Sequence, residues 1–133
     1  MIKPLVWALA LLSANAAADT PASFMAQYAQ QAGVPVSALS PVRGEAFYRA
    51  EHPGRDGGKQ QSCATCHTAN PKQTGKTRVG KPIEPLAPAA NPQRFTEAAK
   101  VEKWFRRNCK DVLKRECTPQ EKGDFVAWLN QIK

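Results

Sequence analysis

The sequence SCATCHTAN, residues 62–70, constrains the fold most, because it places Cys63, Cys66 and His67 in the pattern C-x-x-C-H. A c-type haem needs two thiols spaced so that each reaches one vinyl group. It also needs an imidazole on the same turn that points at the iron. A chain with such a site has to wrap around a large apolar macrocycle. We therefore interpret the motif as the attachment site of one covalently bound haem c.

Zinc and redox chemistry fit the cysteines less well. A zinc site would need two more ligands, and the remaining cysteines, Cys109 and Cys117, are too far apart in sequence for a zinc knuckle. A thioredoxin-like redox pair would need a βαβ context, and the sequence offers none. A secretory N-terminus and an all-α pattern both agree with haem, so we favour haem over zinc and over a redox pair.

The N-terminus has the features of a secretory signal peptide. A lysine precedes an apolar run over residues 5–12, and small residues follow it. The run is too short to span a bilayer. We expect cleavage after Ala18, with Ala16 as the alternative, so that residues 1–18 are the signal and residues 19–133 are a monohaem cytochrome c domain. Together with a thioether haem, this predicts a periplasmic protein.

The chain is basic, with a formal net charge of +8 at pH 7. In the periplasm, a basic surface favours docking to an acidic partner protein, at rates that fall as salt rises. The alternative is that the charge only keeps the protein soluble. Nucleic acid is not expected as a partner outside the cytoplasm, and we expect a monomer.

Local signals predict helices joined by long loops. Ser or Thr followed by Pro, the signal for a helix start, occurs at residues 20–21, 40–41 and 118–119. A further helix is expected from about residue 97 to 115, with Thr96 as its N-cap. Residues 70–95 hold five prolines without periodicity, so we expect an irregular loop that covers something. No stretch alternates like a strand, and the predicted fold class is all-α.

Two of the predicted helices carry matching small and aromatic residues. Gly44 stands three residues before Phe47, and Phe125, Trp128 and Leu129 form one stripe of the last helix. We expect these helices to cross, because a glycine allows two backbones to approach closely. In that arrangement Phe47 would lie near Trp128.

The ordinary ligands for the iron face opposite His67 are missing. Met1 leaves with the signal, Met25 lies far upstream, and no methionine follows the haem motif. The other histidine, His52, stands in a polar, glycine-rich loop, where we expect it to be solvated.

Asn108 is the one polar residue on an otherwise apolar stripe. Val101, Phe105 and Val112 share one face of the predicted helix, and Asn108 lies between them, where a leucine would be expected. A buried amide must be satisfied. The pattern leaves four partners open: backbone, water, a haem propionate, or the iron through the amide oxygen.

Cys109 follows Asn108 directly, and its spacing to Cys117 fits a bridge from the helix to its own C-terminal exit. A loop of that size would contribute roughly 2–3 kcal/mol. The bridge would be either a plain structural staple or a redox switch, and most periplasmic disulfides are structural. In both cases it would fix the backbone next to Asn108.

The segment TGKTRVGKPIEPLAPAANPQRFTEAAKVEKWFRRNCKDVLKRECTPQEKGDF resembles the sphaeroides haem protein family, oxygen-binding monohaem cytochromes c. The resemblance runs from about Val42 to the C-terminus, and KPIEPLAP and RRNC…REC are its most specific parts. It implies a class I cytochrome c fold, with His67 as axial ligand and Asn108 as the second axial ligand of the oxidised iron. It also implies the disulfide Cys109–Cys117.

The same resemblance implies a function. On reduction the asparagine would leave, and the iron would bind oxygen, nitric oxide or carbon monoxide. The electron donor would be a dihaem cytochrome c. Two alternatives remain open: a plain electron carrier whose sixth site stays closed, and an enzyme that reduces or disproportionates oxygen or nitrogen oxides. We assign no catalytic residue, because no second histidine or carboxylate is aimed at the ligand position.

Overall fold

The computed structural model describes residues 17–133, apart from the side chain of Asp56, so that the predicted signal peptide lies almost wholly outside the described residues. Its elements follow the order α1 (Pro21–Ala32), η1 (Val36–Ala38), α2 (Pro41–Arg49), η2 (Arg55–Gly57), α3 (Cys63–His67), β1 (Gly75–Lys76), β2 (Pro82–Ile83), α4 (Ala98–Leu113) and α5 (Pro119–Gln131). The predicted all-α class is confirmed. Within the described residues, no helix has the length and apolar character needed to cross a bilayer.

Three of the four predicted helix starts are where the sequence placed them. The hydroxyls of Thr20, Ser40 and Thr118 each accept a hydrogen bond from the backbone N–H three residues further on. A proline occupies the first turn of each helix, where its missing N–H removes no helical hydrogen bond. These starts were predictable because every partner in them is local.

The start of α4 differs from the prediction. Thr96 is not the N-cap, because its hydroxyl donates to the Gln93 carbonyl at 2.9 Å. The N-cap is Glu97, which makes no side-chain cap bond. Instead the Asp19 carboxylate accepts from the backbone N–H of Ala98 at 2.9 Å. A carboxylate near a helix N-terminus satisfies a free N–H and suits the helix dipole, so a residue distant in sequence caps α4.

The expectation of no strands was wrong at one place. Within the loop over residues 70–95, β1 and β2 pair antiparallel, with Gly75 opposite Ile83 and Lys76 opposite Pro82. Gly80 takes a positive φ of 79° in the connecting turn, a conformation that suits glycine. Two-residue strands are too short to show an alternating pattern, so they could not be predicted from periodicity.

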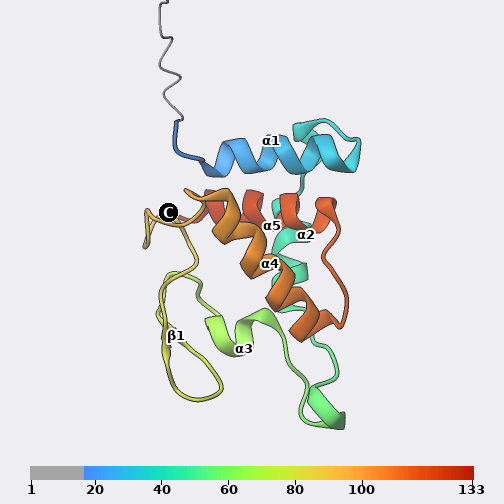
Figure 1. Cartoon of the computed structure of the whole chain (residues 1–133), viewed down its shortest axis with the longest axis vertical. Coiled ribbons are helices and arrows are strands. Elements are labelled where there is room, and N and C mark those ends of the chain that lie inside the picture. The colour runs from blue at the N-terminus through green and yellow to red at the C-terminus, as the bar shows by residue number, and fades with distance from the viewer. Residues whose placement is uncertain (1–16) are drawn as a thin grey trace, which may run out of the picture.

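The helix crossing predicted from Gly44 is confirmed. α5 packs against both α2 and α1, and Figure 1 shows α1 lying across one end of the molecule above α5. A Cβ on Gly44 would come within 2.0 Å of the Asp124 carbonyl oxygen, so only glycine fits there. Close backbone approach joins the N-terminal and C-terminal helices into one core.

The ring partners in this crossing differ from the prediction. Tyr48, not Phe47, lies against Trp128, with ring centroids 4.8 Å apart. The Phe47 ring lies edge-on to that of Phe125, with ring centroids 6.4 Å apart, and Phe47 lines a cavity. Tyr48 follows Gly44 by four positions and so shares its helix face, whereas Phe47 is turned toward the cavity. The Tyr48 ring is fully buried, and its hydroxyl donates to the Thr68 carbonyl directly after α3.

A buried carboxylate further ties α2 to α5. Asp124 is 3% exposed, and it accepts hydrogen bonds from the Ser40 backbone N–H and from the Arg43 guanidinium, each at 2.7 Å. Gln120 of α5 also donates to it, at 3.0 Å, so the charge is satisfied by donors despite its burial. These contacts tie α2 to α5, and the Tyr48 hydroxyl holds this helical core against the segment that carries the cysteine motif.

Candidate functional site

The cysteine motif forms a short helix of its own, α3. Ser62 precedes it in a capping box, in which Ser62 N–H donates to the Thr65 hydroxyl at 2.9 Å. Cys63 and Cys66 carry free thiols and are half-buried. Burial raises the pKa of the Cys63 thiol to about 11, so at neutral pH it is protonated. The structure thus presents two reduced thiols one helical turn apart.

His67 ends α3 and is neutral at pH 7. Burial, and after it the positive charge of Arg94, lower its pKa to about 4. Arg94 is fixed by hydrogen bonds to two loop carbonyls, those of Pro85 at 2.7 Å and Glu84 at 2.6 Å. A neutral imidazole keeps a lone pair free on one nitrogen, which is the form that binds a metal.

A cavity of about 960 Å³ lies between α3, α4 and the proline-rich loop. In Figure 1 α3 lies below α4, and residues of both helices line the cavity. The size is at the upper end of the range of about 300–1,000 Å³ typical of small-molecule and cofactor sites. Residues between positions 77 and 96, most of them in the loop, form a large part of the cavity wall. The loop therefore covers the cavity, as its length predicted.

The stripe identified on α4 faces this cavity. Val101, Phe105, Asn108 and Val112 all line it, together with the two cysteines and the histidine of α3. Asn108 is exposed rather than buried in the core. Within residues 17–133, no hydrogen bond joins its side-chain amide to another protein group. Of the partners that the sequence left open, the protein backbone is therefore not the one observed.

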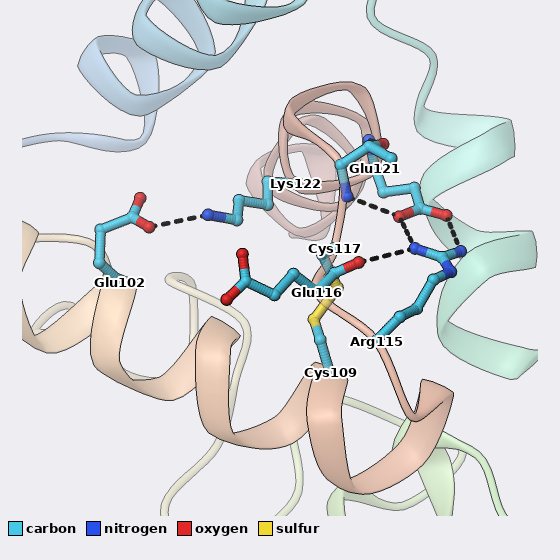
Figure 2. Close-up of a disulfide and its surroundings, with 8 residues drawn as sticks. Glu102, Cys109, Arg115, Glu116, Cys117, Glu121 and Lys122 are labelled. Atoms are coloured by element: carbon cyan, nitrogen blue, oxygen red, sulfur yellow. Dashed lines mark hydrogen bonds and ion pairs between the residues drawn. A yellow bond between two sulfur atoms is a disulfide. The ribbon is translucent and has the colours of Figure 1, made fainter.

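The backbone next to Asn108 is fixed by a disulfide. Cys109 and Cys117 are bonded, with their Cα atoms 5.7 Å apart, and both are buried. Figure 2 shows this bridge joining α4, one turn before its end, to the chain that leads into α5. Beyond it, Arg115 donates to both carboxylate oxygens of Glu121, at 2.6 and 2.8 Å. The exit of α4 is thus tied to the start of α5.

One group of cavity residues was not found from the sequence. The Asp111 carboxylate, three residues after Asn108, accepts from the guanidiniums of Arg55 and Arg78. Arg78 also donates to the Gln61 side chain at 2.8 Å, and Gln61 in turn donates to the Asp111 carbonyl at 3.0 Å. Hydrogen bonds from the two arginines outweigh partial burial and lower the pKa of Asp111. This network ties two loops to α4; the only local signal was a lone acid among basic residues.

The other residues considered as iron ligands lie elsewhere. His52 is not on the cavity wall, and its backbone pairs with that of Gln61 at the base of the glycine-rich loop. Met25 packs against the helical core and does not line the cavity either. Neither residue therefore lines the cavity that His67 lines.

The donor set fits a covalently held haem better than zinc. The disulfide leaves Cys109 and Cys117 unavailable as zinc ligands. In the part of the chain that is described, no three His, Cys, Asp or Glu side chains converge as a metal site. Two free thiols and a neutral imidazole share one largely apolar cavity, which is what a macrocycle bound by two thioethers and one axial nitrogen requires.

Comparisons with known proteins agree with this geometry. The family model described as Domain of unknown function (DUF1924) matches residues 35–129. The chain is 46% identical over 132 residues to cytochrome c-type protein SHP of Cereibacter sphaeroides, which covers 97% of this chain and 98% of that protein.

Two solved structures extend the likeness to the fold. A structure of oxidised SHP, described as an oxygen-binding cytochrome c, has a TM-score of 0.76 at 45% identity, with 84% of this chain and 96% of that chain covered. A solution structure of cytochrome c'' from Methylophilus methylotrophus, described as giving insights into haem-ligand detachment, has a TM-score of 0.70 at 37% identity, with 84% and 93% covered. The predicted class I cytochrome c fold is confirmed by these structures.

Proposed function

The chain belongs to the DUF1924 family, the family of cytochrome c-type protein SHP, and we propose from this that it is a monohaem c-type cytochrome that opens one iron face on reduction. The observation that carries the proposal is the cavity. One part of its wall holds Cys63, Cys66 and His67, and another presents Asn108, whose side-chain amide has no hydrogen-bond partner among residues 17–133.

In this proposal the residues of α3 hold the cofactor. Cys63 and Cys66 bind it through two thioether bonds, and His67 supplies one axial nitrogen to the iron. When bound, the haem supplies an iron that takes up and releases one electron and that accepts small ligands at a free axial position. The Tyr48 hydroxyl, bonded to the Thr68 carbonyl at 2.5 Å, keeps α3 in place against the helical core.

Asn108 is the proposed switch. Its amide oxygen is a hard donor, which prefers ferric over ferrous iron. Asn108 would therefore bind the iron of the oxidised protein and release it on reduction. An iron released by Asn108 would have a free coordination position for oxygen, nitric oxide or carbon monoxide. The free amide on the cavity wall and the likeness to an oxygen-binding cytochrome c support this assignment.

The chain's own residues favour a limited movement of Asn108. The disulfide fixes the backbone directly after it, and Asp111 is held by two arginines one turn later. With α4 restrained on this side, release of Asn108 is a rotation of its side chain and does not require unfolding. The proposed donor of the electron is a dihaem cytochrome c, in the periplasm to which the predicted signal peptide directs the protein.

Carbon monoxide tests the proposal. The haem-loaded protein is reduced anaerobically with dithionite and titrated with carbon monoxide while the Soret band is recorded. We expect the band to shift and sharpen with saturable binding, because the axial position is free in the ferrous state. An unchanged Soret band would show a plain electron carrier whose sixth site never opens.

A further inference from the structure

One face of α4 carries a continuous row of positive charge. Lys100, Lys103, Arg107 and Lys110 follow one another on α4 at steps of three and four, Lys114 is the C-cap of the helix, and all five are exposed. On a helix this spacing places the first four side chains on a single face, and Lys114 extends the row beyond the last turn. We call these five residues the α4 stripe.

The charge of the stripe is little neutralised by the protein itself. Lys100 lies 3.7 Å from Glu97 and Lys110 lies 3.8 Å from Glu116, and such exposed pairs are weak. Among the described residues, Lys103 and Arg107 form no ion pair, although they stand four apart, where like charges repel. The helix thus keeps a repulsive arrangement, and an external anionic group bound at these residues would relieve it.

The α4 stripe meets the proposed haem cavity at Lys100, the one member of the stripe that lines it. Trp104 is 41% exposed and lines the same cavity. Lys103 Nζ and Arg107 Cζ lie 5.0 and 5.2 Å from the Trp104 ring centroid, within cation–π range. The two unpaired cations are therefore held on the aromatic ring at the cavity edge.

The proline-rich loop adds one exposed apolar residue and one lysine to the same cavity wall. Val79 is 80% exposed and lines the cavity, and so does Lys81. The residues around the cavity thus combine exposed apolar side chains, those of Trp104 and Val79, with a margin of lysines and arginines. An apolar centre with a polar, charged rim is the anatomy of a transient protein interface.

We propose that the α4 stripe, with Trp104 and Val79, is the docking surface for an acidic electron-carrier protein, one whose own redox cofactor is ringed by carboxylates. The inference rests on the proposed function, since it places the partner at the edge of the haem cavity. Charge complementarity selects this occupant: opposite charges steer the encounter and fix its orientation, and the apolar centre gives the short approach that electron transfer needs.

The test uses the haem-loaded protein and small oxidants of opposite charge. The ferrous protein gives one electron to ferricyanide, which becomes ferrocyanide, or to tris(phenanthroline)cobalt(III), which becomes cobalt(II). Both rates are measured by stopped flow for the parent and for K103E/R107E. The control is K59E/K133E, which makes the same change in net charge at two exposed lysines that do not line the cavity. Binding of the acidic haem protein cytochrome b5 is titrated in parallel.

We expect K103E/R107E to slow ferricyanide about tenfold or more at low salt, to speed the cobalt complex, and to abolish cytochrome b5 binding. The control should change each rate by less than about threefold, and the contrast should vanish as salt screens the charges. Equal effects of both variants would mean that only net charge matters. If neither variant changes the rates, the proposed docking surface is refuted.

Two further results separate the alternatives. Phosphatidylglycerol vesicles that bind the parent but not K103E/R107E, with both rates unchanged, would assign the stripe to a membrane surface and overturn the proposal. Carbon monoxide binding by each ferrous variant reports on the proposed function separately. If the ferrous parent does not bind carbon monoxide, gas binding is refuted. The docking surface is then still decided by the rates with ferricyanide and the cobalt complex.

Discussion

Removal of the Cys109–Cys117 disulfide should affect both the stability of the protein and the position of Asn108. The two cysteines are eight residues apart. In the chain-entropy model, releasing a loop of that size raises the entropy of the unfolded chain and lowers the free energy of unfolding by about 2.5 kcal/mol. Because both cysteines are buried, alanine at each position also loses some packing, so we expect C109A/C117A to lose about 3–4 kcal/mol.

The assay is urea unfolding of the ferric, haem-loaded protein, followed by the Soret band and by circular dichroism. The single variants C109A and C117A are the controls. Each of them already breaks the bridge, so each should fall within about 1 kcal/mol of the double variant, and the losses should be far from additive. The ferric spectrum of the double variant should also show a mixture of coordination states, because the backbone beside Asn108 is no longer fixed. Additive losses of less than about 1 kcal/mol each, with an unchanged spectrum, would refute the reasoning.

Three further predictions follow from the contacts described above. Trp128→Ala should cost about 3–5 kcal/mol in unfolding free energy, measured by denaturant titration, because the ring is 5% exposed and lies against Tyr48; a loss below 1 kcal/mol would contradict that packing. Thiol counting on the unreduced, haem-loaded protein should find no free cysteine, and two free thiols would argue against either the bridge or the thioethers. At pH values above the ordinary Asp pKa of 3.8, Asp111→Asn should lower the free energy of unfolding, measured by denaturant titration. The difference from the parent should shrink as pH falls through the depressed pKa of Asp111 in the folded parent, because the parent then loses the same charge. A difference that does not change with pH would show that the arginine contacts do not act through charge.

Local chemistry explains what the sequence could predict. The starts of α1, α2 and α5 depend on a hydroxyl and a proline within four residues, and the sequence placed them correctly. The crossing at Gly44 was predictable because a glycine within a helix, near aromatic residues, allows the backbone of a second helix to approach closely. The face of α4 that carries Val101, Phe105, Asn108 and Val112 was found from helical periodicity alone, and it does line the cavity.

What the sequence did not predict depends on contacts between distant residues. Asp19 caps α4 from 79 positions away, and no local pattern reveals it. Asp111 gathers Arg55 and Arg78 from two separate loops, so its role appears only once those loops are folded. The setting of Asn108 was also misjudged: its stripe suggested a buried amide, whereas the side chain is exposed on a cavity wall.

The ferric spectrum of Asn108→Leu beside that of the parent tests whether Asn108 binds the iron. Haem attachment should survive, since Cys63, Cys66 and His67 are unchanged. The control is Asn91→Leu, which removes an amide from the same cavity, but one that already donates to the Pro85 carbonyl.

If the Asn108 oxygen is the second axial ligand of the oxidised iron, Asn108→Leu should change the ferric spin state to that of an iron with a vacant or water-filled position. The ferrous protein should still bind carbon monoxide, and Asn91→Leu should leave the ferric spectrum as in the parent. Identical ferric spectra for Asn108→Leu and the parent would contradict the central claim and leave Asn108 as an ordinary polar residue of the cavity wall.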